Sequence, residues 1–207
     1  MSTLAVFGAS GYAGGNIVGE ALLRGHTVIG FGRTAGSVTG VDLRIGSITD
    51  PDVVESVSRI ADVVVVAVPA GTLLAALPDL MARTVAAGKR LAVVGGAGGL
   101  LVSADGPRFI DTPEFQDLWK LEAEPHVQAL EMLRHAPPEL DWFYLSPAAK
   151  FGKWSPGERT GVYRITDDLL LTDSSGSSNI SGADYAIAFV NEIEVPEHSR
   201  RRFAVAY

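Results

Sequence analysis

The feature that most constrains the fold is an apolar run at residues 4–7 that leads directly into a glycine-spaced turn, Gly8-Ala-Ser-Gly-Tyr-Ala-Gly14. The pattern predicts a strand, a tight turn and a helix. Gly8 allows the turn, Gly11 leaves room for a pyrophosphate, and Gly14 lets the helix pack closely on the strand. An anion would then lie on free N–H groups at the positive end of the helix. Glycines at this spacing also occur in ordinary strand-to-helix turns, so the motif needs context.

The following residues complete a βαβ unit. An amphipathic helix ends at Arg24-Gly25, and residues 27–32 have the pattern of a second strand. A site for NAD usually carries an Asp or Glu at the end of that strand, to bind the ribose 2′-hydroxyl. This chain has Arg33-Thr34 there and no acid before Asp42. A cation suits a 2′-phosphate, which predicts that NADP(H) is preferred over NAD(H); the alternative is that Arg33 is simply solvated.

Strand and helix patterns alternate through the rest of the chain. Strands are expected at 41–45, 62–68, 90–94, 140–145 and 202–207, helices at 52–60, 72–87, 114–134 and 182–194, and a short strand pair within 161–173. The unbroken β-branched run at 62–68 is typical of a central parallel strand, and Pro125 is expected to interrupt or kink its helix. We therefore predict an α/β fold: a single Rossmann-type, doubly wound parallel sheet with helices on both faces, forming one domain over residues 1–207.

Composition narrows the functional classes. A formal net charge of −7 argues against a protein that binds nucleic acid or an anionic membrane. The absence of cysteine excludes disulfides and thiolate chemistry. We find no apolar run of the roughly 18–20 residues needed for a membrane span, no signal peptide pattern and no metal-ligand cluster. A cytoplasmic monomer or homodimer that acts on a small molecule is expected.

In a doubly wound sheet the ligand lies at the carboxyl ends of the strands. The cofactor-binding candidates are the residues that follow the predicted strands: Gly8, Ser10, Gly11, Tyr12, Ala13, Gly14, Arg33, Thr34, Ser47, Ile48, Ala67, Val68, Pro69, Gly95, Gly96 and Pro147. The loop at 95–99 contains four glycines, more than a turn requires. They indicate close approach of a ligand, the alternative being a structural turn.

Six segments carry a resemblance to a known family: Gly8-Ala-Ser-Gly-Tyr-Ala-Gly14, Arg33, Ala61-Asp-Val63, Val93-Val-Gly-Gly-Ala-Gly98, Leu140-Asp-Trp-Phe-Tyr-Leu-Ser-Pro147 and Pro156-Gly-Glu-Arg-Thr-Gly161. The chain resembles the atypical short-chain dehydrogenase/reductases of the NAD(P)H-binding, NmrA-like type over its whole length. Many of these are labelled NADH-flavin reductases, and they are similar to biliverdin-IXβ/flavin reductase. The resemblance implies a Rossmann fold and a nicotinamide cofactor, and says less about the substrate.

The chain departs from the ordinary short-chain reductases at their catalytic positions. Those enzymes use a Ser, a Tyr and a Lys, and this chain has Ala97, Glu122 and His126 at the corresponding places. Chemistry on alcohols or ketones is therefore not expected. His126 is the catalytic candidate, because the unperturbed pKa of histidine, about 6.5, suits proton donation near neutrality. The alternative is that His126 faces solvent or the cofactor ribose.

The acceptor is expected opposite the 95–99 loop, in a small region formed by residues 147–181. Ala97, Gly98, Phe151 and Trp154 are the substrate-side candidates. Two aromatics beside Lys150 and Lys153 suit a planar, anionic ligand such as FMN or another flavin, although Phe151 and Trp154 could equally anchor a loop.

These features favour an NAD(P)H-dependent oxidoreductase that reduces flavins, quinones or similar planar acceptors by direct hydride transfer. The lost catalytic residues are equally explained by a non-catalytic NADP(H)-binding sensor that acts through a partner. A sugar-nucleotide epimerase or dehydratase is a weaker alternative, because the chain lacks both the usual tyrosine and the length of a substrate domain.

Overall fold

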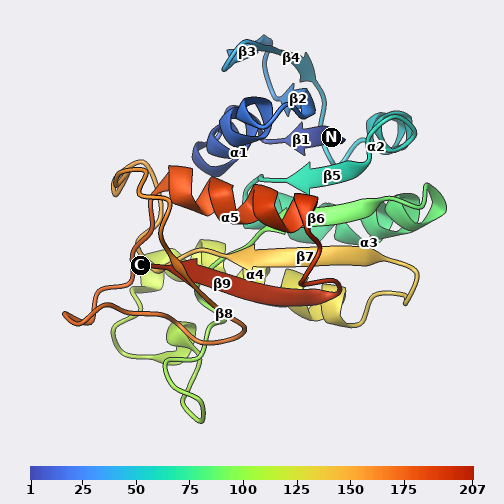
Figure 1. The fold of residues 1–207 in the computed structure, drawn as a ribbon. Coiled ribbons are helices and arrows are strands. Elements are labelled where there is room, and N and C mark those ends of the chain that lie inside the picture. Colours follow the sequence, from blue (N-terminus) through green and yellow to red (C-terminus); the bar gives the residue numbers. More distant parts are fainter.

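The computed structural model describes residues 1–207 and contains one nine-stranded sheet in the order β3-β4-β2-β1-β5-β6-β7-β9-β8 (Figure 1). The strands are β1 (Thr3–Phe7), β2 (Thr27–Gly32), β3 (Gly36–Val38), β4 (Val41–Ile45), β5 (Val63–Val66), β6 (Arg90–Val94), β7 (Asp141–Ser146), β8 (Arg164–Thr166) and β9 (Arg201–Ala206). The helices are α1 (Tyr12–Leu23), α2 (Pro51–Ser58), α3 (Ala70–Ala86), α4 (Asp117–Arg134) and α5 (Gly182–Glu194), with a 3₁₀ turn, η1, at Phe109–Asp111.

Seven strands are parallel, and the two antiparallel strands, β3 and β8, lie at the edges. The chain begins at β1, moves outward through β2 to β4, and then returns to place β5 on the other side of β1. This reversal confirms the predicted doubly wound fold and puts the topological switch point between β1 and β5. A crevice at the carboxyl ends of these strands is where such sheets bind ligands.

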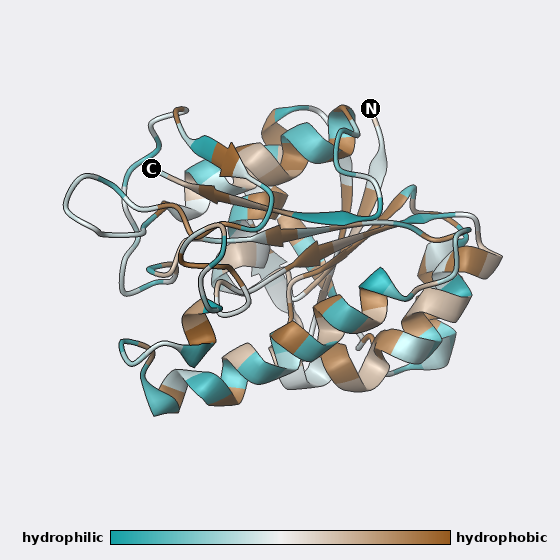
Figure 2. Ribbon diagram, turned by 90° about the horizontal axis from the view of Figure 1, so that it is seen from below, coloured by the Kyte–Doolittle hydropathy of each residue, from teal (hydrophilic) through white to brown (hydrophobic).

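Helices cover both faces of the sheet. Leu4 and Val6 of β1 belong to the core under α1 and α5, whereas Ala5 and Phe7 belong to the core under α2, α3 and α4. The apolar sheet and the amphipathic helices beneath it are visible in Figure 2. All of Val63–Val66 is buried, as expected of a central strand with both faces covered.

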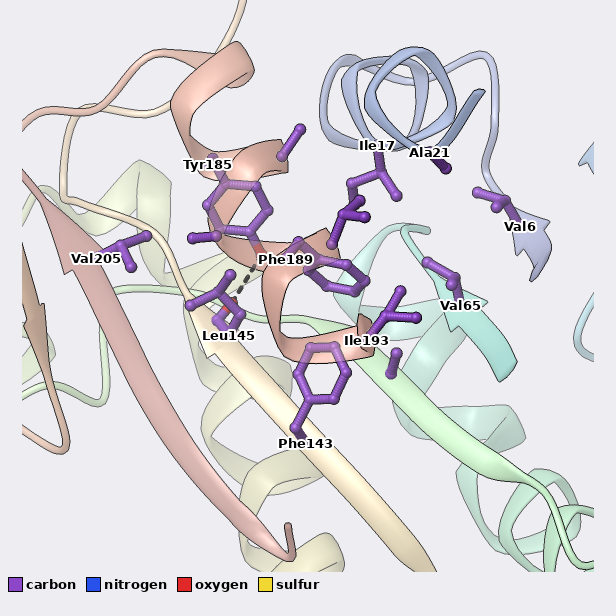
Figure 3. Packing of buried hydrophobic residues seen from close by; sticks show 14 of the residues in the cluster. Val6, Ile17, Ala21, Val65, Phe143, Leu145, Tyr185, Phe189, Ile193 and Val205 are labelled. Carbon is purple, nitrogen blue, oxygen red and sulfur yellow. Dashed lines mark hydrogen bonds between the residues drawn. The ribbon is translucent and has the colours of Figure 1, made fainter. Parts of the chain in front are cut away.

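Helix α5 is fixed by its cap and by its aromatic face. Ser181 accepts a hydrogen bond from the N–H of Asp184 at the helix N-terminus. Tyr185 and Phe189 pack over Phe143 of β7, and the Tyr185 hydroxyl donates to the carbonyl of Leu145 at 2.8 Å (Figure 3). The buried Tyr185 hydroxyl is therefore satisfied by the sheet that α5 covers.

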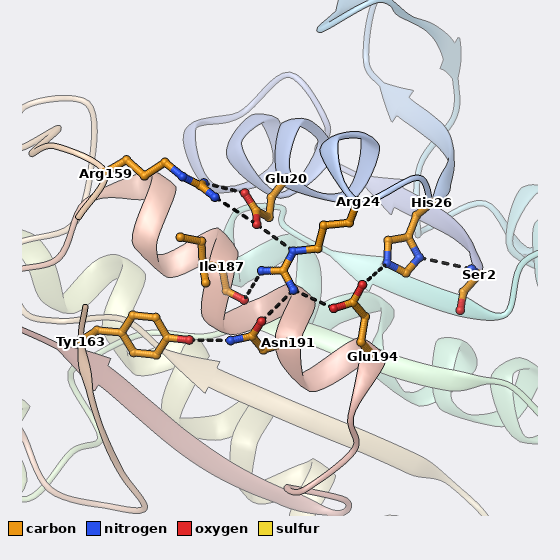
Figure 4. Close-up of polar contacts among 9 residues, drawn as sticks. All are labelled: Ser2, Glu20, Arg24, His26, Arg159, Tyr163, Ile187, Asn191 and Glu194. Carbon is orange, nitrogen blue, oxygen red and sulfur yellow. Dashed lines mark hydrogen bonds and ion pairs between the residues drawn. The ribbon is translucent and has the colours of Figure 1, made fainter. Parts of the chain in front are cut away.

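An ionic network around the buried Glu20 joins α1 to α5 and to the loop before β8 (Figure 4). Glu20 is almost fully buried and binds Arg24 at 2.8 Å and Arg159 at 2.6 Å, and Arg24 continues to Glu194 at 2.7 Å. Burial alone would raise the pKa of Glu20, but the hydrogen bonds from Arg159 and Arg24 lower it. The charged carboxylate thus ties Arg159 to α1, 139 residues away in the sequence.

The sequence-based prediction of a strand pair within 161–173 is wrong. Only Arg164–Thr166 forms a strand, and it pairs with β9; farther on, Asp168 and Leu170 exchange backbone hydrogen bonds with Leu101. Both halves of the segment find distant partners, which local patterning cannot reveal. Strand β3 was not predicted, because its glycine-rich, polar residues show no apolar alternation.

The helix expected from residue 114 begins at Asp117, because Phe115 turns into a small cluster with Ile110 and Ala123. It then runs through Pro125 to Arg134 without a break, so the expected interruption is absent. None of the five helices is long and apolar enough to cross a membrane.

We predict that Gly14→Ala lowers the free energy of unfolding by about 1–3 kcal/mol, because the added Cβ overlaps the packed backbone of the first turn. That Cβ would lie 2.2 Å from the carbonyl oxygen of Gly8. Gly71→Ala is the matched control: it also lies in a first helical turn but its Cβ meets nothing within 4 Å. It should raise stability by up to about 1 kcal/mol. Denaturant unfolding of both variants measures this, and equal effects would contradict the packing argument.

Candidate functional site

The turn after β1 is held by very close backbone contacts at the switch point. Gly8 has a φ of +82°, and a Cβ there would lie 2.1 Å from the carbonyl oxygen of Ala67 at the end of β5. Its N–H donates to the carbonyl of Phe31 at the end of β2. Only glycine meets both demands, so this residue fixes the relative positions of three strand ends.

The N-terminus of α1 faces the crevice with its donors free. Gly11 supplies no side-chain cap, the first turn holds no acidic residue, and the N–H groups of Tyr12, Ala13 and Gly14 have no partner. Free donors at the positive end of a helix form an anion-binding site. The missing side chain of Gly11 leaves the approach open, with only the Gly8 carbonyl within 3.1 Å of a Cβ built there.

A cavity of about 600 Å³ opens beside this helix terminus at the carboxyl ends of β1, β5, β6 and β7. Its lining includes fourteen predicted residues: Gly11, Tyr12, Ala13, Ala67, Val68, Pro69, Gly95, Gly96, Ala97, Gly98, His126, Pro147, Phe151 and Trp154. The candidates for cofactor and for substrate thus share one cavity. In Figure 1 the loops that build it gather beyond the carboxyl ends of the strands, on the side where the C-terminus lies.

A second cavity, of about 280 Å³, lies on the β2 side of the switch point. It includes Gly8, Ser10, Arg33, Ser47 and Ile48, and it shares Gly11, Ala67, Val68 and Pro69 with the larger cavity. The two cavities therefore form one crevice that crosses the strand ends. Arg33 is its only charged residue on this side, and its guanidinium makes no hydrogen bond or ion pair. Thr34 and Gly14 line neither cavity.

An aromatic wall on the far side of the large cavity was not predicted. Phe109, Phe115 and Trp119 stack edge to face in sequence, with ring centroids 5.0 and 5.8 Å apart, and Leu118 lies beside them. They come from η1, the loop before α4 and the first turn of α4. The sequence signal was three aromatics within eleven residues of an irregular stretch, but nothing local shows that they line the cavity.

A buried phenol lies beneath the glycine loop after β6. The Tyr144 hydroxyl accepts from the N–H of Gly96 at 3.1 Å and lies 3.1 Å from Nδ1 of His126. A Cβ on Gly95 would come within 2.0 Å of the Tyr144 ring. The glycines of this loop are therefore required by the packing of the protein itself, which accounts for Gly95 without a ligand.

Burial changes the chemistry expected of His126. The side chain is 11% exposed, and desolvation lowers the pKa of His126 to about 4. The expectation of an unshifted pKa near 6.5 does not hold, so the imidazole is neutral at pH 7. The Tyr144 hydroxyl can donate to Nδ1 at 3.1 Å or to the His126 carbonyl at 3.2 Å, so either nitrogen of the neutral ring can carry the hydrogen. Nε2 lies 3.8 Å from the Glu122 carboxylate. In either tautomer the neutral ring is not an imidazolium acid.

Glu122 connects α4 to the start of α3. One carboxylate oxygen accepts from the backbone N–H of Ala70 at 2.7 Å, the first residue of that helix. The carboxylate is stabilised there by the positive end of α3. This contact holds α4 against the start of α3, next to the loop that follows β5.

The segment after β7 is attached to the first turn of α1. The Tyr12 hydroxyl donates to the carbonyl of Pro156 at 3.2 Å and accepts from Gly182, while its ring packs edge to face on Phe151. Lys150 instead turns to Ser177 at 3.0 Å, and neither Lys150 nor Lys153 lines the cavity. The expected cationic wall for an anionic ligand is therefore absent.

A family model described as NAD(P)H-binding matches residues 8–195. The chain belongs to the NAD(P)H-binding family. The match spans the turn at Gly8, the β6 loop and the segment after β7, which are the parts that build the crevice.

Solved structures of similar proteins cover essentially the whole chain. A protein from Burkholderia pseudomallei that is described as an exported protein is 37% identical, with a TM-score of 0.89 and 100% of both chains covered. SP1627 from Streptococcus pneumoniae, a candidate NADH-flavin reductase, is 30% identical, with a TM-score of 0.88 and coverage of 100% and 99%. A candidate epimerase from Bacteroides thetaiotaomicron is also 30% identical, with a TM-score of 0.88 and coverage of 99% and 96%.

The crevice fits the cofactor class of the NAD(P)H-binding family. Gly11 places no Cβ on the approach to the helix terminus, and the free donors of α1 suit a pyrophosphate. Ala67–Pro69 line both cavities and form an apolar floor that continues from the β2 side of the crevice into the larger cavity. The residues present can therefore hold an extended dinucleotide across the strand ends.

We predict that protonation linked to His126 lowers the free energy of unfolding as the pH falls. Because the pKa of His126 is about 4 in the folded chain and about 6.5 when unfolded, the unfolded chain binds this proton first. The free energy of unfolding should fall by up to about 3 kcal/mol between about pH 6.5 and pH 4, and be unaffected by this group above that range. His126→Gln should remove this part of the slope.

Denaturant unfolding at several pH values measures the effect, with His135→Gln as the control at an exposed histidine. A slope that is the same in wild type and His126→Gln would contradict the lowered pKa.

Proposed function

We propose that this chain is an NADPH-dependent oxidoreductase that passes a hydride directly to a planar acceptor such as a flavin or quinone. The observation that carries the proposal is the continuity of the crevice. A helix-terminal anion site opens into a cavity that has Phe109, Phe115 and Trp119 along one side and Phe151 and Trp154 along another. Flat aromatic walls of this kind bind flat rings by stacking.

The protein's own part would be to bind, orient and exclude water. The N–H groups of the first α1 turn would hold the pyrophosphate, and residues 67–69 with Gly95-Gly96 would form the floor on which the nicotinamide lies. A nicotinamide cofactor, when bound, supplies the hydride. Close positioning of two rings lowers the barrier mainly by removing orientational freedom.

The proton groups near the cavity favour such acceptors over ketones. Tyr144 is hydrogen-bonded beneath Gly96, and burial raises the pKa of Tyr144 well above its usual value. His126 is neutral and offers a hydrogen bond instead of a mobile proton. A flavin or quinone spreads the charge that arrives with the hydride over its rings, so it needs no strong acid beside it.

The absence of an acid group also favours one other function, a dinucleotide sensor that acts through a partner. A sensor would bind NADP⁺ and NADPH but transfer no hydride. An epimerase, the activity in the description of the Bacteroides protein, fits less well because no tyrosine–lysine pair faces the cavity.

The reductase is tested by steady-state NADPH oxidation with riboflavin, FMN and menadione. We expect turnover above the uncatalysed rate with at least one of them. NADPH deuterated at either face of C4 should show a primary isotope effect for one face only, because a fixed ring transfers one hydrogen. Tight dinucleotide binding without transfer to any acceptor would refute the reductase and support the sensor.

Arg33 is proposed to read the 2′-phosphate, since its free guanidinium lies in the small cavity. Arg33→Ala should weaken NADPH binding by about tenfold, the effect of losing a charge-assisted contact of about 1.5 kcal/mol, and leave NADH binding nearly unchanged. Arg59→Ala, which removes an exposed cation outside both cavities, should change neither affinity. Equal losses for NADPH and NADH in Arg33→Ala would show that Arg33 does not contact the phosphate.

A further inference from the structure

The acceptor side of the crevice contains a single formal charge. Of the 24 residues that line the large cavity, Glu122 is the only carboxylate, and none is a lysine or arginine. The other titratable groups there do not offset it, because His126 is neutral at pH 7. The crevice therefore carries one cation, Arg33, on the β2 side and one anion, Glu122, on the acceptor side.

One carboxylate oxygen of Glu122 is held by a hydrogen bond, while much of the side chain is exposed. Its carboxylate accepts from the Ala70 N–H at 2.7 Å, yet the side chain remains 58% exposed. No arginine or lysine pairs with it; the one ion-pair partner within reach is the uncharged His126 at 3.8 Å. Glu122 therefore contributes an unneutralised negative charge to the lining of the cavity.

Glu122 also removes the place where an anionic acceptor would otherwise bind. The start of α3 is a positive helix terminus beside the cavity, and a carboxylate of the protein already occupies its first N–H group. The two lysines of the neighbouring segment do not compensate, since Lys150 binds Ser177 and Lys153 lies outside the lining.

We propose that Glu122 is a specificity residue that makes this site select uncharged planar acceptors over phosphorylated or otherwise anionic ones. The inference rests on the proposed reductase function and narrows its substrate class. An anion brought into a partly enclosed cavity beside an unneutralised carboxylate is repelled, whereas a neutral ring stacks on the same walls at no electrostatic cost.

Riboflavin and FMN provide the test, because they share one ring system and differ by a phosphate. Their dissociation constants are measured by flavin fluorescence with saturating NADP⁺, so that no turnover is needed. Wild type should bind riboflavin about three- to tenfold more tightly than FMN. In Glu122→Gln the ratio should fall to about one, since the amide oxygen can still accept from Ala70 while the charge is lost.

Glu124→Gln is the matched control, because it removes the same charge from the same helix outside the large cavity and should leave the ratio unchanged. Raising ionic strength from about 0.01 M to about 0.15 M should tighten FMN binding relative to riboflavin in wild type, a readout that needs no variant. Equal affinities in wild type, no binding of either flavin, or a ratio that survives in Glu122→Gln would overturn the proposal.

The outcome is separable from that of the reductase assay. Charge-selective binding without NADPH oxidation would retain the role of Glu122 and refute hydride transfer. NADPH oxidation with FMN as efficient as with riboflavin would retain the reductase and refute the role of Glu122.

Discussion

The contact between Gly8 and Ala67 positions nearly everything else in the crevice. It brings the ends of β1 and β5 so close that a single added carbon would meet the Ala67 carbonyl at 2.1 Å. Gly14 then packs on the Gly8 carbonyl in the same way, which draws the first turn of α1 down onto the strand ends. These two close approaches determine where the free N–H groups of α1 point, and both require that Gly8 and Gly14 lack side-chain atoms.

A second set of contacts attaches the acceptor-side segment to this framework. Asp184, fully buried at the start of α5, accepts from Thr160, Gly161 and the hydroxyl of Tyr207. Burial alone would raise the pKa of Asp184, but these hydrogen bonds lower it and keep the carboxylate charged. Tyr12 of α1 also donates to the carbonyl of Pro156, so the loop that follows β7 is attached to both α5 and α1. The first turn of α1 and one wall of the large cavity therefore belong to one packed unit.

The sequence predicted what depends on local pattern. Periodicity located the helices and parallel strands, including the helix expected at 182–194, which is α5, and the glycine spacing located the turn. It could not predict features that depend on contacts between distant segments. Strand β8 exists through β9, and the aromatic wall faces the cavity through the path of the loop after β6. Tyr144 lies in a continuous apolar strand pattern that does not distinguish its two faces, so neither its contact with His126 nor the burial of that histidine was visible.

These long-range contacts decide what chemistry the crevice can support. A proton donor near neutral pH needs a pKa close to 7, and burial has moved the two candidates in opposite directions, His126 downward and Tyr144 upward. Both are then held in their neutral forms and linked to each other through a hydrogen bond. Under the proposed function, an acceptor reduced here would have to hold its new charge until solvent supplies a proton; solvent reaches the cavity lining at Trp154, which is 66% exposed. The same burial that holds this pair in a neutral, hydrogen-bonded form removes it from acid–base catalysis near pH 7, so the proposed reductase would depend on stacking geometry and on charge to discriminate among acceptors.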